Sequence, residues 1–337
     1  MLRDIYNRPL KDLRISVTDR CNFRCTYCMP FDEYEWIDKK EILTFEEIER
    51  LANLFVQLGV DKIRLTGGEP LLRRDLEKLI SKLSSLSGLK DLCLTTNGSL
   101  LAEKVSDLQF AGLKRVNVSL DTLNPEKFAR IRRRSDLAKV LEGLFAAKRS
   151  GLHPIKINAV IERRVNDDDI IDLVEFSRKN GFAIRFIEYM DVGNSNNWTS
   201  EKLVSKREIL ERVHARFPLR EVGREMGSAP SVDYEFTDGG GELGVIASVT
   251  EPFCSTCTRA RLTADGKLVT CLFSATGHDL KKLLRNGATD EEIIEVISAI
   301  WGERTDRYSD ERLEAMNLAR AYRAKDHNKI EMIRLGG

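Results

Sequence analysis

Three cysteines lie within eight residues near the start of the chain, at Cys21, Cys25 and Cys28. Three thiolates with this C-x3-C-x2-C spacing can hold one iron-sulfur cube and leave its fourth iron without a protein ligand. An iron with an open position can bind and activate another molecule. Two simpler interpretations stay open: a zinc knuckle, which needs a fourth Cys or His nearby, or three buried thiols.

A second set of three cysteines, with C-x2-C-x13-C spacing, lies at Cys254, Cys257 and Cys271. By the same argument it offers three thiolates and one vacant position. Taken alone, it also fits a zinc ribbon that lacks one ligand, or part of a disulfide framework. The seventh cysteine, Cys93, lies inside an apolar run and is expected to be a small buried hydrophobic residue.

Six short β-rich runs alternate with helical patterns in the first part of the chain and must position the first cysteine set. They cover residues 14–18, 62–66, 92–96, 116–120, 155–160 and 184–188. Helices are expected after a capping box at Thr44 and Glu47, and over 71–86, 101–110, 137–148 and 170–179. This alternation predicts parallel strands with right-handed crossovers, in either a doubly wound sheet or an incomplete barrel.

In both architectures ligands bind at the carboxyl ends of the strands. The first cysteine loop lies at such an end, as do Gly67-Gly68-Glu69-Pro70 and Thr95-Thr96-Asn97-Gly98. After Asp191 the composition shifts toward Gly, Asn and Ser, so we expect a boundary between about Asn197 and Pro230. The remainder predicts a hairpin through 264–267 and closing helices around 291–301.

The chain has 337 residues, with 54 Lys and Arg against 53 Asp and Glu, a net charge of +1. This balance excludes a polycationic protein that wraps nucleic acid, so an anionic partner must be bound by a few well-placed cations. No apolar run approaches a membrane span and no secretory signal is evident, so we expect a cytoplasmic protein with reduced cysteines.

The first cysteine loop, with Tyr27 before its last cysteine, and the Gly-Gly-Glu-Pro strand end together resemble the radical S-adenosylmethionine (SAM) superfamily. The second cysteine set, followed by Thr258-Arg259-Ala260-Arg261, resembles the members that cyclise GTP in the first step of molybdenum cofactor biosynthesis. This resemblance covers nearly the whole chain, from Arg14 to Gly337. It implies an α/β fold: an incomplete (β/α)6 TIM-like barrel over 1–200, whose open side is closed by a smaller α+β region over 201–337.

The resemblance also implies the cofactors and their ligands. Cys21, Cys25 and Cys28 hold a first [4Fe-4S] cluster, and Cys254, Cys257 and Cys271 hold a second. SAM binds the first cluster and contacts Tyr27, Gly68, Ser119 and Met190. Guanine binds the open iron of the second cluster.

In this family the lyase reaction starts when a 5′-deoxyadenosyl radical takes hydrogen from the ribose C3′ of GTP. The carbon radical attacks C8, and reduction with protonation gives 3′,8-cyclo-7,8-dihydro-GTP. Residues implied in catalysis are Arg14, Arg259, Arg261 and the tail residues Gly336 and Gly337. Residues implied in GTP binding are Arg14, Arg64, Thr95, Lys156, Arg259, Ala260 and Arg261.

The residues themselves support part of this assignment. Arg259 and Arg261 alternate along a strand, so both point to one side, which suits bidentate phosphate contacts. Arg14 and Arg64 are either solvated or point into a barrel mouth. By contrast, Arg132-Arg133-Arg134 is expected to be a solvated helix end without a role.

The implied partners are GTP, an electron donor of the flavodoxin or ferredoxin type, and the cyclic pyranopterin monophosphate synthase that receives the product. A homodimer is plausible from the family alone, and neither nucleic acid nor a membrane is expected. Two alternatives stay open. One is a two-cluster radical enzyme that modifies a peptide, and the other is a zinc-binding interaction module or electron carrier.

Overall fold

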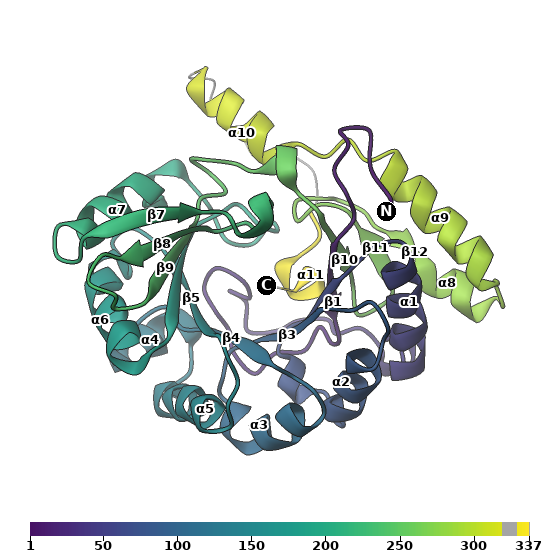
Figure 1. Ribbon diagram of the computed structural model, residues 1–337, viewed down its shortest axis with the longest axis horizontal. Coiled ribbons are helices and arrows are strands. Elements are labelled where there is room, and N and C mark those ends of the chain that lie inside the picture. Colours follow the sequence, from purple (N-terminus) through teal and green to yellow (C-terminus); the bar gives the residue numbers. More distant parts are fainter. Residues whose placement is uncertain (319–328, 337) are drawn as a thin grey trace.

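The computed structural model describes residues 1–318 and 329–336, and its centre is a curved sheet of strands that follow one another in chain order (Figure 1). All six predicted strands are present, and each is parallel to the next. They are β1 (Asp12–Ser16), β2 (Lys62–Thr66), β3 (Asp91–Thr96), β4 (Arg115–Ser119), β5 (Ile155–Ile161) and β6 (Ala183–Glu188).

The helices between these strands lie around the outside of the sheet (Figure 1). They are α1 (Phe45–Gln57), α2 (Leu76–Ser84), α3 (Leu101–Phe110), α4 (Pro125–Arg132), α5 (Leu137–Arg149) and α6 (Ile170–Asn180). A doubly wound sheet reverses its strand order and carries helices on both faces. The sequential order and the outer helices exclude that alternative and confirm the incomplete barrel.

Local sequence features explain where the helices begin. The Thr44 hydroxyl accepts from the Glu47 amide while the Glu47 carboxylate accepts from the Thr44 amide, so the predicted capping box is present at α1. The predicted helix over 71–86 begins later, at Leu76. A short 3-10 helix over Pro70–Leu72 comes first, and the backbone is extended at Arg73. The Arg73 guanidinium donates to the carbonyls of Val17 and Leu43.

The C-terminal part of the chain adds strands to both edges of the barrel. β9 (Glu242–Ile246) pairs in parallel with β6, and β10 (Arg259–Leu262) pairs in parallel with β1. The sheet then ends in antiparallel strands, with β8 (Val232–Phe236) and β7 (Leu219–Gly223) at one edge and β11 (Lys267–Val269) and β12 (His278–Asp279) at the other. Among the residues that the structure describes, the sheet therefore has two free edges and does not close. The predicted hairpin through 264–267 joins β10 to β11.

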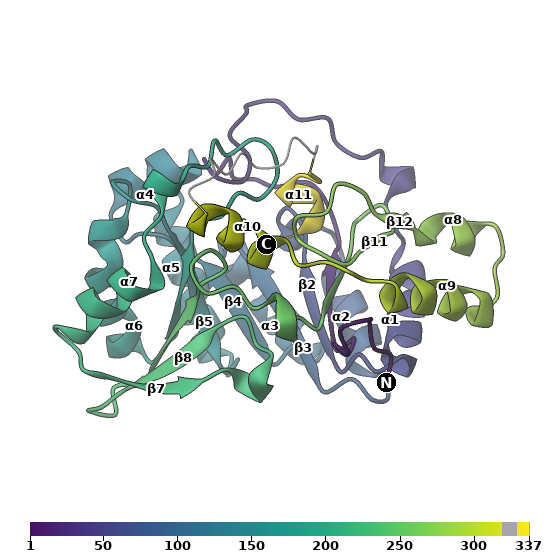
Figure 2. The same cartoon turned by 90° about the horizontal axis from the view of Figure 1, so that it is seen from above.

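Five further α-helices follow in the described portion of the C-terminal part. They are α7 (Lys206–His214), α8 (Leu280–Arg285), α9 (Asp290–Gly302), α10 (Tyr308–Asn317) and α11 (Met332–Leu335). Helix α9 matches the predicted closing helix. Helix α11 lies inside the ring of strands in Figure 1. In Figure 2 the N-terminus and the β7–β8 hairpin lie toward one end of the molecule and α11 toward the other.

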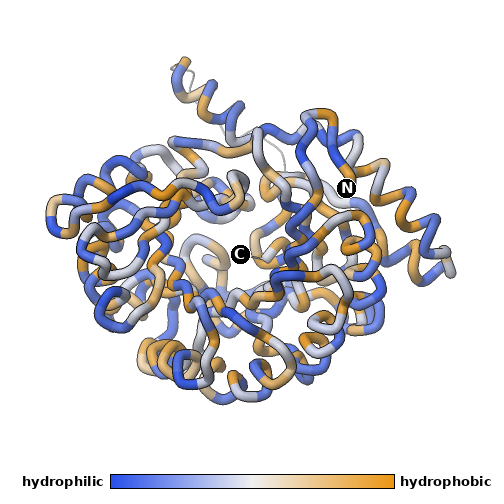
Figure 3. Tube along the Cα trace, viewed as in Figure 1, coloured by the Kyte–Doolittle hydropathy of each residue, from blue (hydrophilic) through white to orange (hydrophobic). Residues whose placement is uncertain are grey.

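Alternation along the strands separates the apolar core from the barrel interior. Leu13 and Ile15 of β1, and Ile63 and Leu65 of β2, are fully buried in the hydrophobic core. The residues between them are polar, so Arg14, for example, faces the other side of the sheet. Figure 3 shows this mixture of hydrophilic and hydrophobic residues along the chain. Among the described residues, no helix is long and apolar enough to cross a membrane.

Candidate active site

The first cysteine set lies in the loop that follows β1, at the carboxyl end of the barrel. Burial, and then the neighbouring thiols of Cys25 and Cys21, raise the pKa of Cys28 well above its ordinary value. Burial, Cys25 and Glu69 raise the pKa of Cys21 to about 12. The three sulfurs are thus close enough to repel one another as thiolates, and bound cationic iron removes this penalty because coordinated thiols are deprotonated.

Two adjacent glycines at the end of β2 hold this loop. A Cβ on Gly67 would lie 2.4 Å from the Thr18 carbonyl oxygen, and one on Gly68 would lie 2.3 Å from that of Arg20. The Gly68 amide donates to the Thr18 carbonyl at 2.8 Å, and the Glu69 amide donates to that of Arg20. Glycine is required because the backbone of the strand end packs directly on the backbone of the cysteine loop.

The Glu69 side chain connects the end of β2 to the end of β3. Its carboxylate accepts from the Thr96 hydroxyl and the Asn97 amide, each at 2.7 Å. Burial raises the pKa of Glu69 to about 7, although these hydrogen bonds act in the opposite direction. The strand ends below the cysteine loop are therefore joined by buried hydrogen bonds.

Arg132 corrects one prediction. We expected Arg132, Arg133 and Arg134 to form a solvated helix end, and the last two are exposed, but Arg132 is only 3% exposed. Its guanidinium donates to the Cys25 sulfur at 3.1 Å and forms an ion pair with Asp121. A run of arginines in a sequence does not show which one turns inward, because that depends on the tertiary partner.

The residues expected around SAM lie at the carboxyl ends of the same strands. Tyr27 belongs to the cysteine loop and donates to the Asp121 carboxylate at 2.9 Å, Ser119 ends β4, and Met190 follows β6. The Met190 carbonyl accepts from the Asn196 side chain at 2.7 Å. The structure therefore brings these positions to one end of the barrel.

The second cysteine set is assembled by the β10–β11 hairpin. Cys254 and Cys257 precede β10, and Cys271 follows β11, so the antiparallel pairing of the two strands brings Cys271 back toward Cys257. Burial is the main cause of a raised pKa at Cys254, and it raises the pKa of Cys271 to about 12. The Cys257 thiol adds to both shifts. These three thiols are therefore neighbours.

Cys257 differs from the other thiols because two arginines contact its sulfur. Arg259 donates to it at 3.0 Å and Arg304 at 3.3 Å. Burial alone would raise the pKa of Cys257, but these cations outweigh it and hold the pKa at about 7. Arg304 was not predicted from the sequence, since it follows the end of α9 and its side chain is only 2% exposed.

Three arginines lie side by side inside the barrel on neighbouring strands. Arg14 of β1 is in register with Arg64 of β2 on one side and with Arg261 of β10 on the other. Burial, Arg261 and Arg64 lower the pKa of Arg14 well below its ordinary value, and burial and Arg259 lower that of Arg261 to about 10. Such a row of poorly neutralised cations fits a bound polyanion.

A narrow cavity of about 70 Å³ opens at the amino ends of these strands, beside Arg14, Arg64, Arg185 and Arg259. The Nε atoms of Arg14 and Arg64 are buried without a hydrogen-bond partner among the described residues. Arg185 was not predicted, although its inward position on β6 follows from the same alternation that places Arg14.

Two other residues expected to contact the nucleotide, Thr95 and Ala260, lie on different sides of the sheet. Thr95 accepts from the Arg64 guanidinium at 3.2 Å and so belongs to the arginine row. The side chain of Ala260 is fully buried in the hydrophobic core, on the opposite face of β10 from Arg259 and Arg261. Any contact of Ala260 with a ligand in the barrel is therefore restricted to its backbone.

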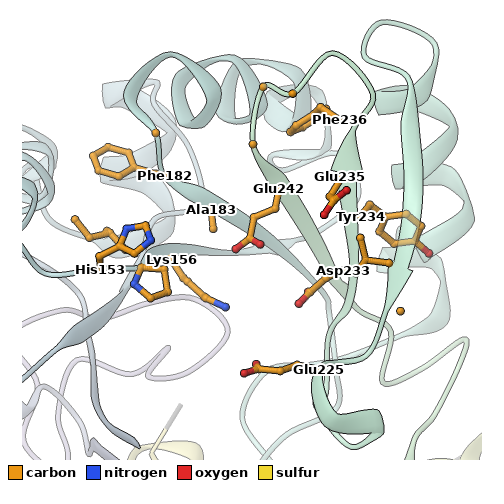
Figure 4. A pocket seen from close by; sticks show the side chains of 18 of the residues that line it. His153, Lys156, Phe182, Ala183, Glu225, Asp233, Tyr234, Glu235, Phe236 and Glu242 are labelled. Atoms are coloured by element: carbon orange, nitrogen blue, oxygen red, sulfur yellow. The ribbon is translucent and has the colours of Figure 1, made fainter.

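A larger cavity of about 800 Å³ lies at the amino ends of β5, β6 and β9 and contains Lys156 (Figure 4). Figure 4 shows the Lys156 side chain together with the carboxylates of Glu225, Asp233 and Glu242. Burial and Arg185 lower the pKa of Lys156 to about 8. The protonation of Lys156 therefore depends on the charged groups at this end of the barrel.

The described end of the C-terminal tail contacts the arginine row. Arg261 donates to the carbonyls of Leu335 and Gly336, at 3.1 and 2.5 Å. A Cβ on Gly336 would lie 2.2 Å from the Thr66 side chain. Gly337 lies outside the described residues.

Cys93 is fully buried in β3, as predicted. The described residues contain no group of three or more His, Cys, Asp or Glu side chains arranged to hold a single metal ion.

Comparison with known proteins agrees with this arrangement. Residues 15–177 match the Radical SAM superfamily, and residues 182–310 match the family described as Molybdenum Cofactor Synthesis C. The chain is similar to GTP 3′,8-cyclase of Acidothermus cellulolyticus, with 47% identity over 100% of this chain and 99% of the relative. It is also similar to the GTP 3′,8-cyclases of Xanthomonas axonopodis pv. citri and Staphylococcus haemolyticus, each with 45% identity and the same coverage.

Among solved structures, Streptococcus suis SuiB has a similar fold, with a TM-score of 0.59 and 18% identity over 94% of this chain and 69% of the SuiB chain. A second SuiB structure, bound to S-adenosylmethionine, gives a TM-score of 0.56. At this identity the likeness shows the partial-barrel fold alone. The full-length matches, together with the cysteine sets and the arginine row, show that this chain belongs to the GTP 3′,8-cyclase family of radical SAM enzymes.

Proposed function

We propose that this protein converts GTP to 3′,8-cyclo-7,8-dihydro-GTP, the first step of molybdenum cofactor biosynthesis. The observation that carries the proposal is the row of Arg261, Arg14 and Arg64 inside the barrel, between two sets of cysteines. A polyanionic substrate such as GTP supplies the negative charge that these guanidinium groups lack among the described residues.

The two cysteine sets lie at opposite ends of one pair of strands. Because β10 is parallel to β1, Cys257 before β10 lies at the amino end of the pair, whereas the Cys21 loop follows its carboxyl end. A nucleotide held along this axis reaches both ends. Its guanine is then directed to one cysteine set and its ribose to the other, which is the positioning that a radical transfer requires.

We assign Cys21, Cys25 and Cys28 to the [4Fe-4S] cluster that binds SAM. The Cys254, Cys257 and Cys271 set is our proposed site for a second [4Fe-4S] cluster that binds guanine. Buried neighbouring thiols fit such ligation at both sites. The first cluster with bound SAM supplies a 5′-deoxyadenosyl radical, and the ribose C3′ hydrogen of GTP is its proposed target.

The remaining residues position the ligands. Tyr27, Gly68, Ser119 and Met190 are proposed to surround SAM at the carboxyl end of the barrel. The proposed GTP contacts are Arg14, Arg64, Thr95, Lys156, Arg259, Arg261 and the backbone of Ala260. Gly336 and Gly337 bring a backbone without side chains next to the reacting ribose, and Arg14, Arg259 and Arg261 stabilise its anionic groups during the reaction.

The proposal extends to partners and to the division of the chain. Residues 1–200 carry the SAM chemistry, and residues 201–337 carry the guanine site and the tail. An electron donor of the flavodoxin or ferredoxin type reduces the clusters, cyclic pyranopterin monophosphate synthase takes up the product, and the chain forms a homodimer.

Isotope transfer tests the reaction. Protein reconstituted anaerobically with iron and sulfide is incubated with SAM, dithionite and GTP deuterated at C3′. We expect deuterium in 5′-deoxyadenosine and the cyclised nucleotide as product. Deuterium that stays entirely in GTP while SAM is cleaved contradicts the C3′ step, and the control with GTP deuterated at C2′ shows whether another ribose position reacts.

A further inference from the structure

Arg132 makes a direct contact with the first cysteine set that the proposed function does not use. One end of its guanidinium donates to the Cys25 sulfur at 3.1 Å, and the other forms a 2.7 Å ion pair with the Asp121 carboxylate. Arg132 is 3% exposed and Asp121 is 1% exposed. A buried arginine is costly unless its charge is used by buried partners, so this placement requires an explanation.

The backbone around Arg132 holds the same loop. The Arg24 amide donates to the Arg132 carbonyl at 3.1 Å, and the Thr26 amide donates to the Ile131 carbonyl at 3.0 Å. These bonds use the last carbonyls of α4, which have no partner within the helix. The cysteine loop and the end of α4 are therefore one rigid unit, and the guanidinium is fixed relative to the Cys25 sulfur.

Asp121 is fixed equally well. One of its carboxylate oxygens accepts from the Val160 amide at 3.0 Å, and the other accepts from the Tyr27 hydroxyl at 2.9 Å. One cation and one anion are thus held next to the same cluster, and only the cation donates directly to a cysteine sulfur.

We propose that Arg132 is a positioning residue that sets the reduction potential of the SAM-binding cluster. Reduction by one electron from the donor makes the cluster more negative, and a fixed cation that donates to a ligand sulfur favours that form. Arg132 therefore raises the potential of the first cluster, and Asp121 opposes it from the far side of the ion pair. This inference rests on the first cluster and is independent of GTP as the substrate.

The test is a redox titration of the first cluster in the full-length chain, with dithionite as reductant. Electron paramagnetic resonance measures the amount of reduced cluster at each potential. Replacing all three second-set cysteines by serine leaves the first cluster as the source of the spectrum. In this background Arg132→Met is expected to lower the ratio of reduced to oxidised cluster at a fixed potential at least tenfold, which corresponds to a shift of about 59 mV or more to negative values. Arg133→Met, at the exposed neighbouring arginine, is the matched control and should leave the potential unchanged.

A second variant separates electrostatic control from loss of structure. Asp121→Asn removes the opposing charge, so it should shift the potential to positive values, opposite to Arg132→Met. Damage to the loop alone would move both variants in the same direction, and that outcome overturns the proposal, as does an unchanged potential in an Arg132→Met protein with full iron content. If Arg132→Met does not retain iron, Arg132→Gln, which keeps a neutral donor, takes its place and should also shift the potential to negative values. None of these measurements uses GTP, so failure of the proposed cyclisation leaves this result unaffected.

Discussion

Arg261 of β10 donates to the carbonyl oxygen of Gly336, joining a strand of the barrel to the C-terminal tail across 75 residues of sequence. The same nitrogen also donates to the Leu335 carbonyl. The guanidinium that we assign to GTP therefore also anchors the tail. Under this assignment, substrate binding and placement of the tail depend on the same residue.

Gly336→Ala should strongly reduce cyclisation without affecting the clusters. A Cβ at this position would lie 2.2 Å from the Thr66 side chain, and the backbone has φ of +73°, so alanine displaces the tail. We expect cyclisation to fall about 100-fold, the cost of a misplaced positioning group, while iron content and cleavage of SAM stay unchanged. Deleting Gly336 and Gly337 together should stop cyclisation.

The control for this experiment is Gly302→Ala at the end of α9, where an added Cβ meets nothing within 4 Å. Product formation is measured by chromatography, and SAM cleavage is measured as 5′-deoxyadenosine. Full cyclisation by the Gly336→Ala protein would show that the tail has no part in the reaction.

GTP affinity should depend on pH through Lys156. Burial and Arg185 lower the pKa of Lys156 to about 8, so its cation is present below this pH and is lost above it. The dissociation constant of GTP should rise up to about tenfold between about pH 7 and about pH 9 as this contact loses its charge, a change of about 1.4 kcal/mol in binding free energy.

Lys156→Arg is the matched variant, because its guanidinium stays protonated throughout this range and should remove the pH dependence. Equilibrium dialysis with GTP under anaerobic conditions gives the dissociation constant of each protein at each pH. The same rise in the Lys156→Arg protein would assign the pH dependence to another group.

Cys254→Ala should halve the iron content of the reconstituted protein. Two [4Fe-4S] clusters contain about eight irons and eight sulfides per chain, and loss of the second cluster leaves about four of each. Iron and sulfide analysis after anaerobic reconstitution measures this, with Cys93→Ala as the control at a buried cysteine outside both sets. About two zinc ions in place of iron would support the zinc-binding alternative, and unchanged iron would exclude Cys254 as a ligand.

Asp191→Asn should destabilise the protein. Asp191 forms ion pairs with Arg312 and Lys329, which are 1% and 5% exposed. Removing the carboxylate leaves two buried cations, at a cost of about 3–5 kcal/mol in the free energy of unfolding. Burial would raise the pKa of Asp191, but the two cations outweigh it and lower the pKa. The carboxylate's contribution is therefore full near neutral pH and is lost as strong acid protonates it.

Denaturant titration of the apoprotein measures the free energy of unfolding. Asp238→Asn is the control, because the Asp238 side chain is 59% exposed in its ion pair with Arg178, and an ion pair at the surface is worth about 0–1 kcal/mol. Equal effects of the two substitutions would contradict a stabilising role for the buried ion pairs.

The sequence by itself determined the features that depend on local spacing. The cysteine sets, the capping box at Thr44, the hairpin through Gly266 and the six parallel strands all follow from residues close together in the chain. Turn chemistry, capping and alternation act over a few residues, so a single sequence contains them. The predicted start of α2 was wrong: the backbone is extended at Arg73, whose guanidinium contacts a carbonyl distant in sequence.

Only the tertiary structure decided which charges meet in the barrel. The pairing of β10 with β1 places Cys257 and Cys21 at opposite ends and brings Arg261 next to Arg14. The burial of Arg132 depends in the same way on Asp121 and on the cysteine loop. These contacts join segments far apart in the chain. The local sequence around an arginine is the same whether its charge is buried or solvated. Only the folded structure therefore distinguishes a buried arginine from a solvated one.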